Sequence, residues 1–147
     1  MDIRDAALKY LASRARTCGE MEKHLQDKGF EAKEIGEIIK NFVELHYLDD
    51  MDYCIRYFDF AFRKGRGVLR VKRELEEKGV PRQTIDIAYE DYEGTETELE
   101  RAKGQAEKIV SGREIDQKLL AKIGRRLTAM GFSSDVIYKV IGMYMRD

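Results

Sequence analysis

Leu25-Gln26-Asp27-Lys28-Gly29-Phe30, followed by Ile35, is the stretch that decides the fold, because the chain repeats its pattern twice. The later copies are Leu75-Glu76-Glu77-Lys78-Gly79-Val80 with Ile85, and Leu127-Thr128-Ala129-Met130-Gly131-Phe132 with Ile137. Leu25 and Leu75 are 50 residues apart, and Leu75 and Leu127 are 52 apart. A nearly fixed period indicates an array of similar supersecondary units. We therefore expect three modules, over residues 1–48, 49–94 and 95–147.

Composition and capping residues indicate that each module consists of helices. The chain has a single proline, no long strand-like alternation and many strong helix formers. In the first module we expect helices over residues 5–15, over 17–29 and from residue 31. Thr17 and Glu20 form the pattern of a capping box, and Gly29 suits the left-handed end of a helix. The predicted fold class is all-α, with three tandem three-helix, helix–turn–helix-like repeats in an elongated array.

The modules share a set of inward-facing apolar positions. The second helices use Cys18, Met21 and Leu25, then Val68, Val71 and Leu75, then Leu120, Ile123 and Leu127. The third helices use Ile35, Ile38, Ile39 and Phe42, then Ile85, Ala88, Tyr89 and Tyr92, then Ile137, Val140, Ile141 and Tyr144. Such spacing is typical of a buried helical stripe. We also expect Leu8 and Leu11 to face inward, residues 47–50 and 93–97 to join the modules, and Asp49 or Asp50 to cap the following helix.

Composition argues against several classes of protein. The 147 residues include 27 basic and 28 acidic ones, so the formal net charge of −1 favours neither a nucleic-acid nor a membrane partner. No apolar run approaches the length of a bilayer span and the N-terminus is polar, so we expect a cytoplasmic protein. Cys18, Cys54, His24 and His46 lack the spacing of disulfides or metal sites, which predicts reduced thiols and no metal or cofactor. No catalytic constellation is recognisable, so we expect no enzyme.

A second regularity lies on the middle helices, opposite the apolar stripe. Three positions per module, at offsets of four and seven residues, lie within about 40° of the first on the helical face. They are Arg16, Glu20 and Lys23, then Arg66, Arg70 and Arg73, then Lys118, Lys122 and Arg125. The last two trios are entirely basic. They are either ordinary solvated faces or surfaces for an anionic ligand, namely phosphate backbone or acidic protein. Phosphate contact would be largely sequence-independent and strongly salt-dependent.

Two features of the second module also allow more than one interpretation. Lys64-Gly65-Arg66-Gly67 precedes the middle helix, where glycines can expose amides to an anion. No P-loop signature follows, so we favour a flexible hinge between two helices. Tyr53, Tyr57 and Phe60 lie at helical spacing, which favours core or module-interface positions over a platform for stacking bases.

Several motifs together carry a family resemblance. They are Tyr47-Leu48-Asp49-Asp50 with Tyr53, Tyr57 and Phe58, Lys64-Gly65-Arg66-Gly67-Val68-Leu69-Arg70 leading into Glu74-Leu75-Glu76-Glu77-Lys78-Gly79-Val80, and Ala7-Leu8-Lys9-Tyr10-Leu11 with Arg14 and Glu20. In order and spacing they resemble the RecX family of bacterial regulatory proteins. The resemblance is dense over residues 5–90. In the third module only the helical spacing and the Leu-Met-Gly-Phe-Ile frame persist.

The resemblance implies tandem three-helix repeats and a non-enzymatic role. RecX proteins bind the RecA recombinase filament, protein plus DNA, along its groove and restrain its strand exchange and ATP hydrolysis. We therefore expect this chain to inhibit RecA as a monomer, with weak or indirect nucleic-acid contact and no membrane contact. The candidate contact residues come from the basic stripes and their neighbours: Arg63, Lys64, Arg66, Arg70, Lys72, Arg73, Lys118, Lys122, Arg125 and Arg126.

The residues alone leave two other functions open, a helical-repeat adaptor for another acidic protein and a non-specific DNA-binding protein. Many RecX proteins are strongly basic, whereas this chain has a pI of about 6.2, which argues against strong binding to free DNA. The chain also has His46 where the family usually has glycine, just before the Tyr-Leu-Asp-Asp linker. A non-glycine residue held there in the left-handed conformation costs up to about 1 kcal/mol.

Overall fold

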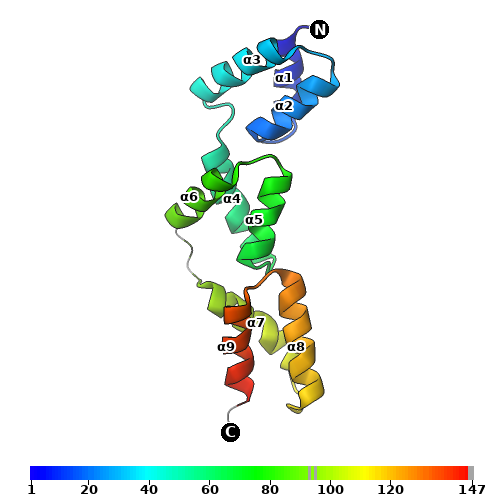
Figure 1. Ribbon diagram of the computed structural model, residues 1–147, viewed down its shortest axis with the longest axis vertical. Coiled ribbons are helices and arrows are strands. Elements are labelled where there is room, and N and C mark those ends of the chain that lie inside the picture. The colour runs from blue at the N-terminus through cyan, green and yellow to red at the C-terminus, as the bar shows by residue number, and fades with distance from the viewer. Residues whose placement is uncertain (93, 95, 146–147) are drawn as a thin grey trace. The chain divides into compact units, whose positions relative to one another are not determined.

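The computed structural model describes residues 1–92, 94 and 96–145, and every regular element in that part of the chain is an α-helix (Figure 1). In chain order the helices are α1 (Ile3–Leu11), α2 (Cys18–Asp27), α3 (Ala32–Glu44), α4 (Asp50–Arg63), α5 (Val68–Glu77), α6 (Arg82–Asp91), α7 (Glu98–Val110), α8 (Gln117–Met130) and α9 (Ser134–Tyr144). The all-α prediction is confirmed. In the predicted second linker, Glu93 and Thr95 lie outside the described residues.

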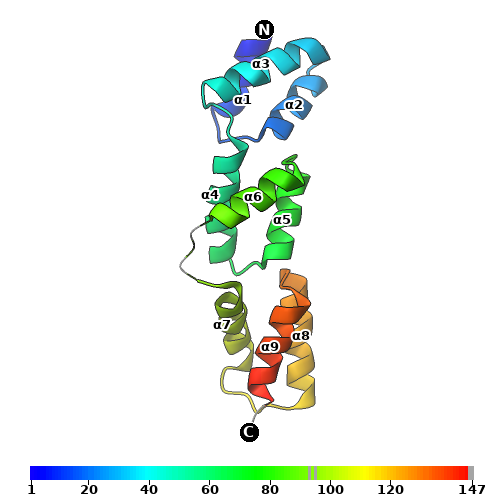
Figure 2. The ribbon, with the colours of Figure 1, turned by 60° about the vertical axis from the view of Figure 1, so that its left-hand side comes forward.

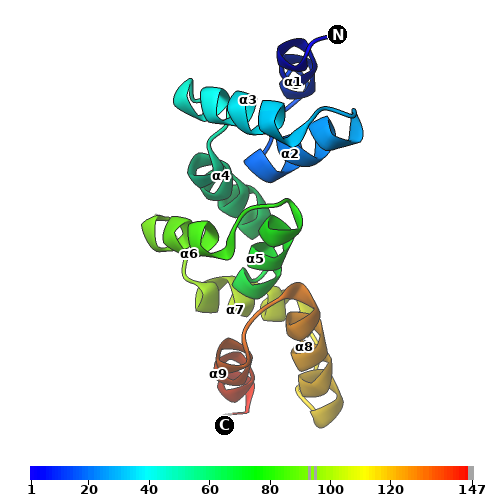
Figure 3. The same cartoon turned by 45° about the horizontal axis from the view of Figure 1, so that its top comes forward.

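The chain divides into two compact units. The first comprises Met1–Arg56 and Leu75–Asp91, and the second comprises Tyr57–Glu74 and Tyr92–Asp147. In the first unit α1, α2 and α3 pack around an apolar core (Figure 2). In the second unit α7, α8 and α9 do the same (Figure 3).

The predicted inward positions of α2 and α3 are confirmed. Met21, Leu25 and Phe42 have no exposed surface, and Ile35 is almost completely buried. Cys18 and Ile39 are half-buried at the edge of the same core. The apolar stripe read from the sequence is thus the surface that holds the first three helices together.

The first helix differs from its prediction. α1 ends at Leu11 instead of residue 15, and Leu8 is 40% exposed. The inward stripe of α1 runs through Ile3, Ala6, Ala7, Tyr10 and Leu11. These residues follow the i, i+3, i+4, i+7, i+8 pattern, so Leu8 lies on the neighbouring side of the helix. The contact is made by the small side chains of Ala6 and Ala7 and not by the larger Leu8.

The predicted capping box opens α2. The Thr17 hydroxyl oxygen accepts from the Glu20 amide at 2.9 Å, and Glu20 Oε1 accepts from the Thr17 amide at 3.0 Å. Thr17 is also fully buried, and its hydroxyl donates to the carbonyl oxygen of Lys78 at 2.5 Å within the same unit. One side chain therefore caps its own helix and binds the turn after α5.

Left-handed residues lie where the sequence places them. The repeat glycines Gly29, Gly79 and Gly131 have φ values of +89°, +87° and +94°. His46 has a φ of +60° and is the non-glycine residue of the described chain with positive φ. The expected strain at His46 is therefore present, since a Cβ disfavours this conformation.

Two aspartates organise the start of α4. Asp49 Oδ1 accepts from the Asp52 amide at 3.1 Å, which confirms the predicted cap. Asp50 Oδ1 accepts from the Cys18 amide at 2.9 Å, so it serves α2 as well as its own helix. The first amides of a helix have no acceptor within that helix. The Asp50 carboxylate of α4 therefore provides an acceptor for the first amide of α2.

The core of the second unit confirms the apolar positions of the third module. Ile123, Leu127 and Val140 have no exposed surface, and Phe132 is almost completely buried. α7 contributes Ala102 and Ala106 to the same core, with larger side chains around its edge. The small residues let α7 lie close to its two neighbours.

The turn at residues 64–67 is packed, which contradicts the flexible-hinge interpretation. The amides of Gly67 and Leu69 donate to the carbonyl oxygens of Met130 and Gly131 at 2.8 and 3.1 Å, within the second unit. The Val68 amide donates to the Glu98 carboxylate at 3.2 Å. Three successive amides at the start of α5 are therefore accepted by atoms from the third module.

Candidate functional site

Four of the predicted contact residues form a row along α8: Lys118, Lys122, Arg125 and Arg126. All four are exposed, and none forms a hydrogen bond or an ion pair with another described residue. Asp116 starts the helix by accepting from the Leu119 amide at 2.8 Å. Ile123 and Leu127 on the same helix are fully buried, so helical periodicity turns the cations of this α8 row toward solvent.

The second basic stripe is partly neutralised by Glu74. Arg66 Nη1 lies 3.2 Å from Glu74 Oε1, and Arg70 Nε lies 3.3 Å from Glu74 Oε2. The hydroxyl of Tyr57 donates to Glu74 Oε1 at 3.1 Å. Arg66 precedes α5 and so is not on the helical face that the prediction assumed. We call these four residues the Glu74 cluster, in which one carboxylate holds two guanidinium groups.

The remaining cations of the second stripe lie apart from this cluster. Arg73 is exposed on α5, and Lys72 is half-buried. Arg63 is the exposed last residue of α4, and it lines a pocket together with residues of α7. Lys64 follows in the turn and is also exposed. The basic residues of the predicted stripe therefore lie in several different local environments and do not form one continuous surface.

Phe60 is a solvent-exposed aromatic, contrary to the expectation of a core or module-interface position. Half of its surface is accessible, whereas Phe58 and Phe62 are buried. The Lys64 ammonium and the central carbon of the Arg66 guanidinium each lie 5.7 Å from the centre of the Phe60 ring. These distances suit cation–π contacts. The inward side of α4 runs through Phe58 and Phe62, which places Phe60 on the other side.

The C-terminal end of α8 directly touches the first turn of α5. A Cβ added to Gly131 would lie 2.7 Å from the Arg70 amide nitrogen and would overlap the Cβ of Arg70. Together with the hydrogen bonds from the Gly67 and Leu69 amides, this contact fixes the two helix ends against each other. The α8 row and the Glu74 cluster therefore belong to the same compact unit.

In the first module, two members of the equivalent trio, Arg16 and Glu20, have partners within the module. Glu20 Oε2 pairs with Arg14 Nη2 at 3.0 Å. The central carbon of the Arg16 guanidinium lies 3.9 Å from the centre of the Tyr10 ring, and Arg16 Nε donates to the Tyr10 carbonyl oxygen at 3.2 Å. Glu20, which interrupts the basic trio of the first module in the sequence, therefore also forms an ion pair with Arg14 in the structure.

Comparison with known families accounts for the three modules. The family models of the first, second and third three-helix domains of RecX match residues 4–41, 49–88 and 96–141. The chain belongs to the RecX family. Each matched range contains one complete copy of the repeated pattern that opens at Leu25, Leu75 or Leu127.

Individual RecX proteins are similar over most of the chain. "Regulatory protein RecX" of Trichlorobacter lovleyi is 30% identical over 136 residues, which cover 90% of this chain and 88% of the relative. The RecX of Listeria welshimeri is 31% identical over 133 residues, 88% of this chain and 49% of the relative. This chain therefore spans about half the length of that Listeria protein. The crystal structure of RecX from Lactobacillus salivarius is 26% identical, with a TM-score of 0.86 and coverage of 97% of this chain and 94% of that one.

Sequence reasoning missed two residues of this RecX-family chain that shape its charged surface. Glu74 lies four residues after Arg70, a spacing at which opposite charges on a helix meet, so a signal was available. Arg101 on α7 is only 8% exposed. Nothing in the sequence distinguishes it from the surface arginines, because its burial depends on residues distant in the chain.

Two kinds of site are absent from the described part of this RecX-family chain. Within residues 1–92, 94 and 96–145 no helix is long and apolar enough to span a bilayer. In the same residues no group of His, Cys, Asp and Glu side chains is placed to hold a metal ion.

Proposed function

We propose that this RecX-family protein binds the RecA–DNA filament and inhibits RecA strand exchange and ATP hydrolysis. The observation that carries the proposal is the α8 row, four exposed cations with no partner in the described chain. The choice of RecA as the partner rests on family membership, because the relatives are named as regulatory proteins of the RecX type. We take the protein to act as a cytoplasmic monomer of three modules with the bounds predicted above.

The two basic regions should contribute unequally to binding. A cation of the α8 row can meet a phosphate or carboxylate without first breaking an ion pair. Arg66 and Arg70 must leave Glu74, or share it, before they contact a new anion. We therefore expect the α8 row to carry more of the affinity than the Glu74 cluster, and the binding to weaken as salt rises.

DNA-stimulated ATP hydrolysis by the cognate RecA, titrated with the purified protein, tests the proposal. The variant Lys118→Glu/Lys122→Glu/Arg125→Glu reverses three charges of the α8 row. Its matched control is Lys9→Glu/Lys33→Glu/Lys40→Glu, which reverses three exposed lysines of α1 and α3 in the first unit. Both change the net charge equally, so a difference between them reports position and not charge alone.

Inhibition by the wild type and the control, with at least about tenfold more of the α8 variant needed for the same effect, would support the proposal. Full inhibition by a folded α8 variant would show that the α8 row does not contribute to binding. If the wild type leaves RecA hydrolysis unchanged at stoichiometric excess, the RecA proposal itself fails. Binding of free DNA with a steep salt slope would then favour the DNA-binding alternative.

A further inference from the structure

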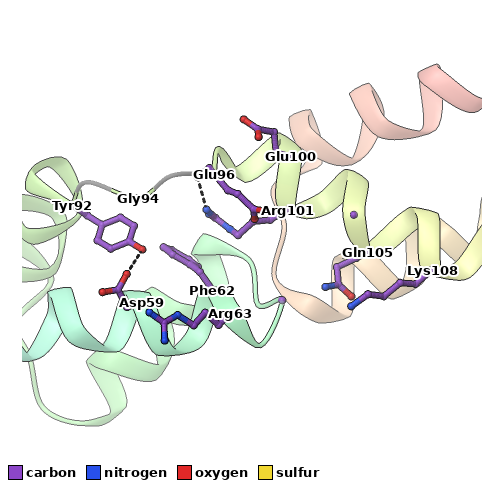
Figure 4. Close-up of a pocket in the computed structure, with 12 residues that line it drawn as sticks. Asp59, Phe62, Arg63, Tyr92, Gly94, Glu96, Glu100, Arg101, Gln105 and Lys108 are labelled. Carbon is purple, nitrogen blue, oxygen red and sulfur yellow. Dashed lines mark hydrogen bonds between the residues drawn. The ribbon is translucent and has the colours of Figure 1, made fainter.

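A pocket of about 560 Å³ lies in the second unit between the end of α4 and α7 (Figure 4). Its wall is formed by Asp59, Phe62, Arg63, Gly65, Tyr92, Gly94, Glu96, Glu100, Arg101, Gly104, Gln105 and Lys108. This volume lies within the range of pockets that hold small molecules. No basic stripe read from the sequence predicts it, and it lies on different residues from the α8 row.

Arg101 is the unusual residue of this pocket. It is only 8% exposed, and its guanidinium stacks 3.8 Å above the centre of the Phe62 ring. Nη1 donates to the carbonyl oxygen of Glu96 at 3.0 Å, while Nε has no hydrogen-bond partner among the described residues. No described carboxylate forms an ion pair with it. A buried charge without a counter-ion is costly, so an anion in the pocket would compensate it.

Two further cations line the pocket without a partner in the described chain, Arg63 from α4 and Lys108 from α7. Figure 4 shows Arg63 below the Phe62 ring and Lys108 beside Gln105 at the opposite end. Arg63, Lys108 and the Gln105 amide thus offer hydrogen-bond donors from two helices.

Two of the three acids that line the pocket, Asp59 and Glu100, bind other groups, and the third, Glu96, is exposed. Asp59 Oδ1 accepts from the Tyr92 hydroxyl at 2.6 Å. Burial and this hydrogen bond raise the pKa of Tyr92 to about 12, which keeps the hydroxyl a donor. Glu100 belongs to the capping box of Thr97, where Oε1 accepts from the Thr97 hydroxyl at 3.1 Å. Their charges limit the affinity for an anion, but their oxygens do not pair with Arg101.

Gly104 also lines the pocket. It lies within α7, where glycine is the least favourable residue apart from proline. A Cβ added there would meet nothing within 4 Å, so alanine would fit and would strengthen the helix. The glycine therefore serves no packing contact in the described chain, but it keeps the pocket wall flat where a side chain would project.

We propose that this pocket binds a phosphate ester, whose negative charge is compensated by Arg101 and by the other cations of the pocket wall. A single carboxylate would fill little of the volume and would use few of the donors. A phosphate presents more acceptor oxygens to arginine, lysine and amide groups, and its organic part can lie along Tyr92. The phosphate can come from a free nucleotide or from the end of a nucleic-acid strand. The inference does not depend on the RecA proposal, because it concerns binding by the isolated protein.

Isothermal titration calorimetry of the full chain at low salt tests the inference with inorganic pyrophosphate, ADP and a short 5′-phosphorylated oligothymidine. Arg101→Met removes the buried charge and keeps a similar volume, so we expect it to fold. Gly104→Leu adds a side chain at the pocket wall without removing any cation. Arg113→Met removes an exposed cation of the second unit that neither lines the pocket nor belongs to the α8 row, and serves as the control.

We expect pyrophosphate to bind the wild type and the control alike, and each pocket variant to bind it about tenfold more weakly or worse. ADP as an equal or better ligand would identify a nucleotide, and the oligonucleotide as a better one would identify a strand end. No heat from any of the three phosphates would overturn the inference. Equal weakening by Arg113→Met would also overturn it, because the binding would then be a general charge effect. If a glutamate-rich peptide binds and the phosphates do not, the pocket recognises carboxylates and the inference is wrong.

Discussion

Replacing Gly131 by alanine should destabilise this protein far more than the same change at an open glycine. Gly131 has a φ of +94°, and its missing Cβ leaves room for the first turn of α5. An added methyl group would overlap Arg70 Cβ and lie 2.7 Å from the Arg70 amide nitrogen. These atoms belong to the backbone or are attached to it, so no rotation of a side chain relieves the clash.

The expected magnitude has two parts. The left-handed conformation costs a residue with a Cβ about 1–2 kcal/mol relative to glycine. Crowding of packed atoms adds about 1–3 kcal/mol. The free energy of unfolding should therefore fall by about 2–5 kcal/mol for Gly131→Ala. Loss of the hydrogen bonds to the Met130 and Gly131 carbonyls would place the result at the upper end.

Gly112 provides a matched control in the same unit. Its φ is +72°, and a Cβ there would meet nothing within 4 Å. Gly112→Ala should therefore cost only the conformational part, about 1–2 kcal/mol. Gly29 is the repeat equivalent of Gly131, with a φ of +89° and the same open surroundings, so Gly29→Ala should behave like Gly112→Ala.

Urea unfolding followed by far-ultraviolet circular dichroism measures the three variants against the wild type. The reasoning requires Gly131→Ala to be less stable than Gly112→Ala by at least about 1 kcal/mol. If the two variants agree within about 0.5 kcal/mol, the end of α8 does not press on α5 in solution and the packed turn is refuted.

Three further outcomes follow from the structure. His46→Gly should raise the free energy of unfolding by about 1 kcal/mol, since His46 has a φ of +60°, and an unchanged urea midpoint would contradict the strain. Thr17→Ala should lower it by about 1–3 kcal/mol in the same assay, because the buried hydroxyl serves both Glu20 and Lys78, whereas Thr97→Ala at the exposed capping box should cost about 1 kcal/mol. Burial raises the pKa of the Cys18 and Cys54 thiols to about 12 from an ordinary 9.0, so neither should react with a disulfide reagent near pH 8 until the protein unfolds. The stability that these thiols contribute is complete below pH 9 and is lost as the pH rises toward 12. Rapid labelling of both thiols in the folded protein would refute the raised pKa values.

Local features of the fold could be predicted because they depend on residues close in sequence. The capping box of Thr17 and Glu20, the glycine turns and the Asp49 cap each involve residues within a few positions of one another. The helical stripe around Ile35 and Phe42 depends on periodicity alone. Leu8 shows the limit of this reasoning, because size suggested burial while geometry selected the neighbouring alanines.

The candidate site was less predictable because charge alone does not say which cations are free. The sequence does not distinguish the ten basic positions from one another. In the structure, Arg66 and Arg70 form ion pairs with Glu74, whereas the side chains of the α8 row have no partner in the described chain. Spacing predicts a core or module-interface position for Phe60, although half of its surface is accessible. Arg101 is buried by contacts with α4 and by the pocket wall, which no short window of sequence contains.

The amides at the start of α5 depend on acceptors from another module, so the repeats cannot simply be removed or exchanged. Gly67, Val68 and Leu69 donate to acceptors from the third module, and Cys18 donates to Asp50 across the boundary between the first two modules. A truncation after residue 94 would leave three helix-opening donors of α5 without acceptors and should fray that helix. A copied module placed after the second one would have to supply the same acceptors, namely carbonyl oxygens at the end of its second helix and a carboxylate in the position of Glu98. The motif at Gly131 thus serves its own module as a turn and the preceding module as a cap.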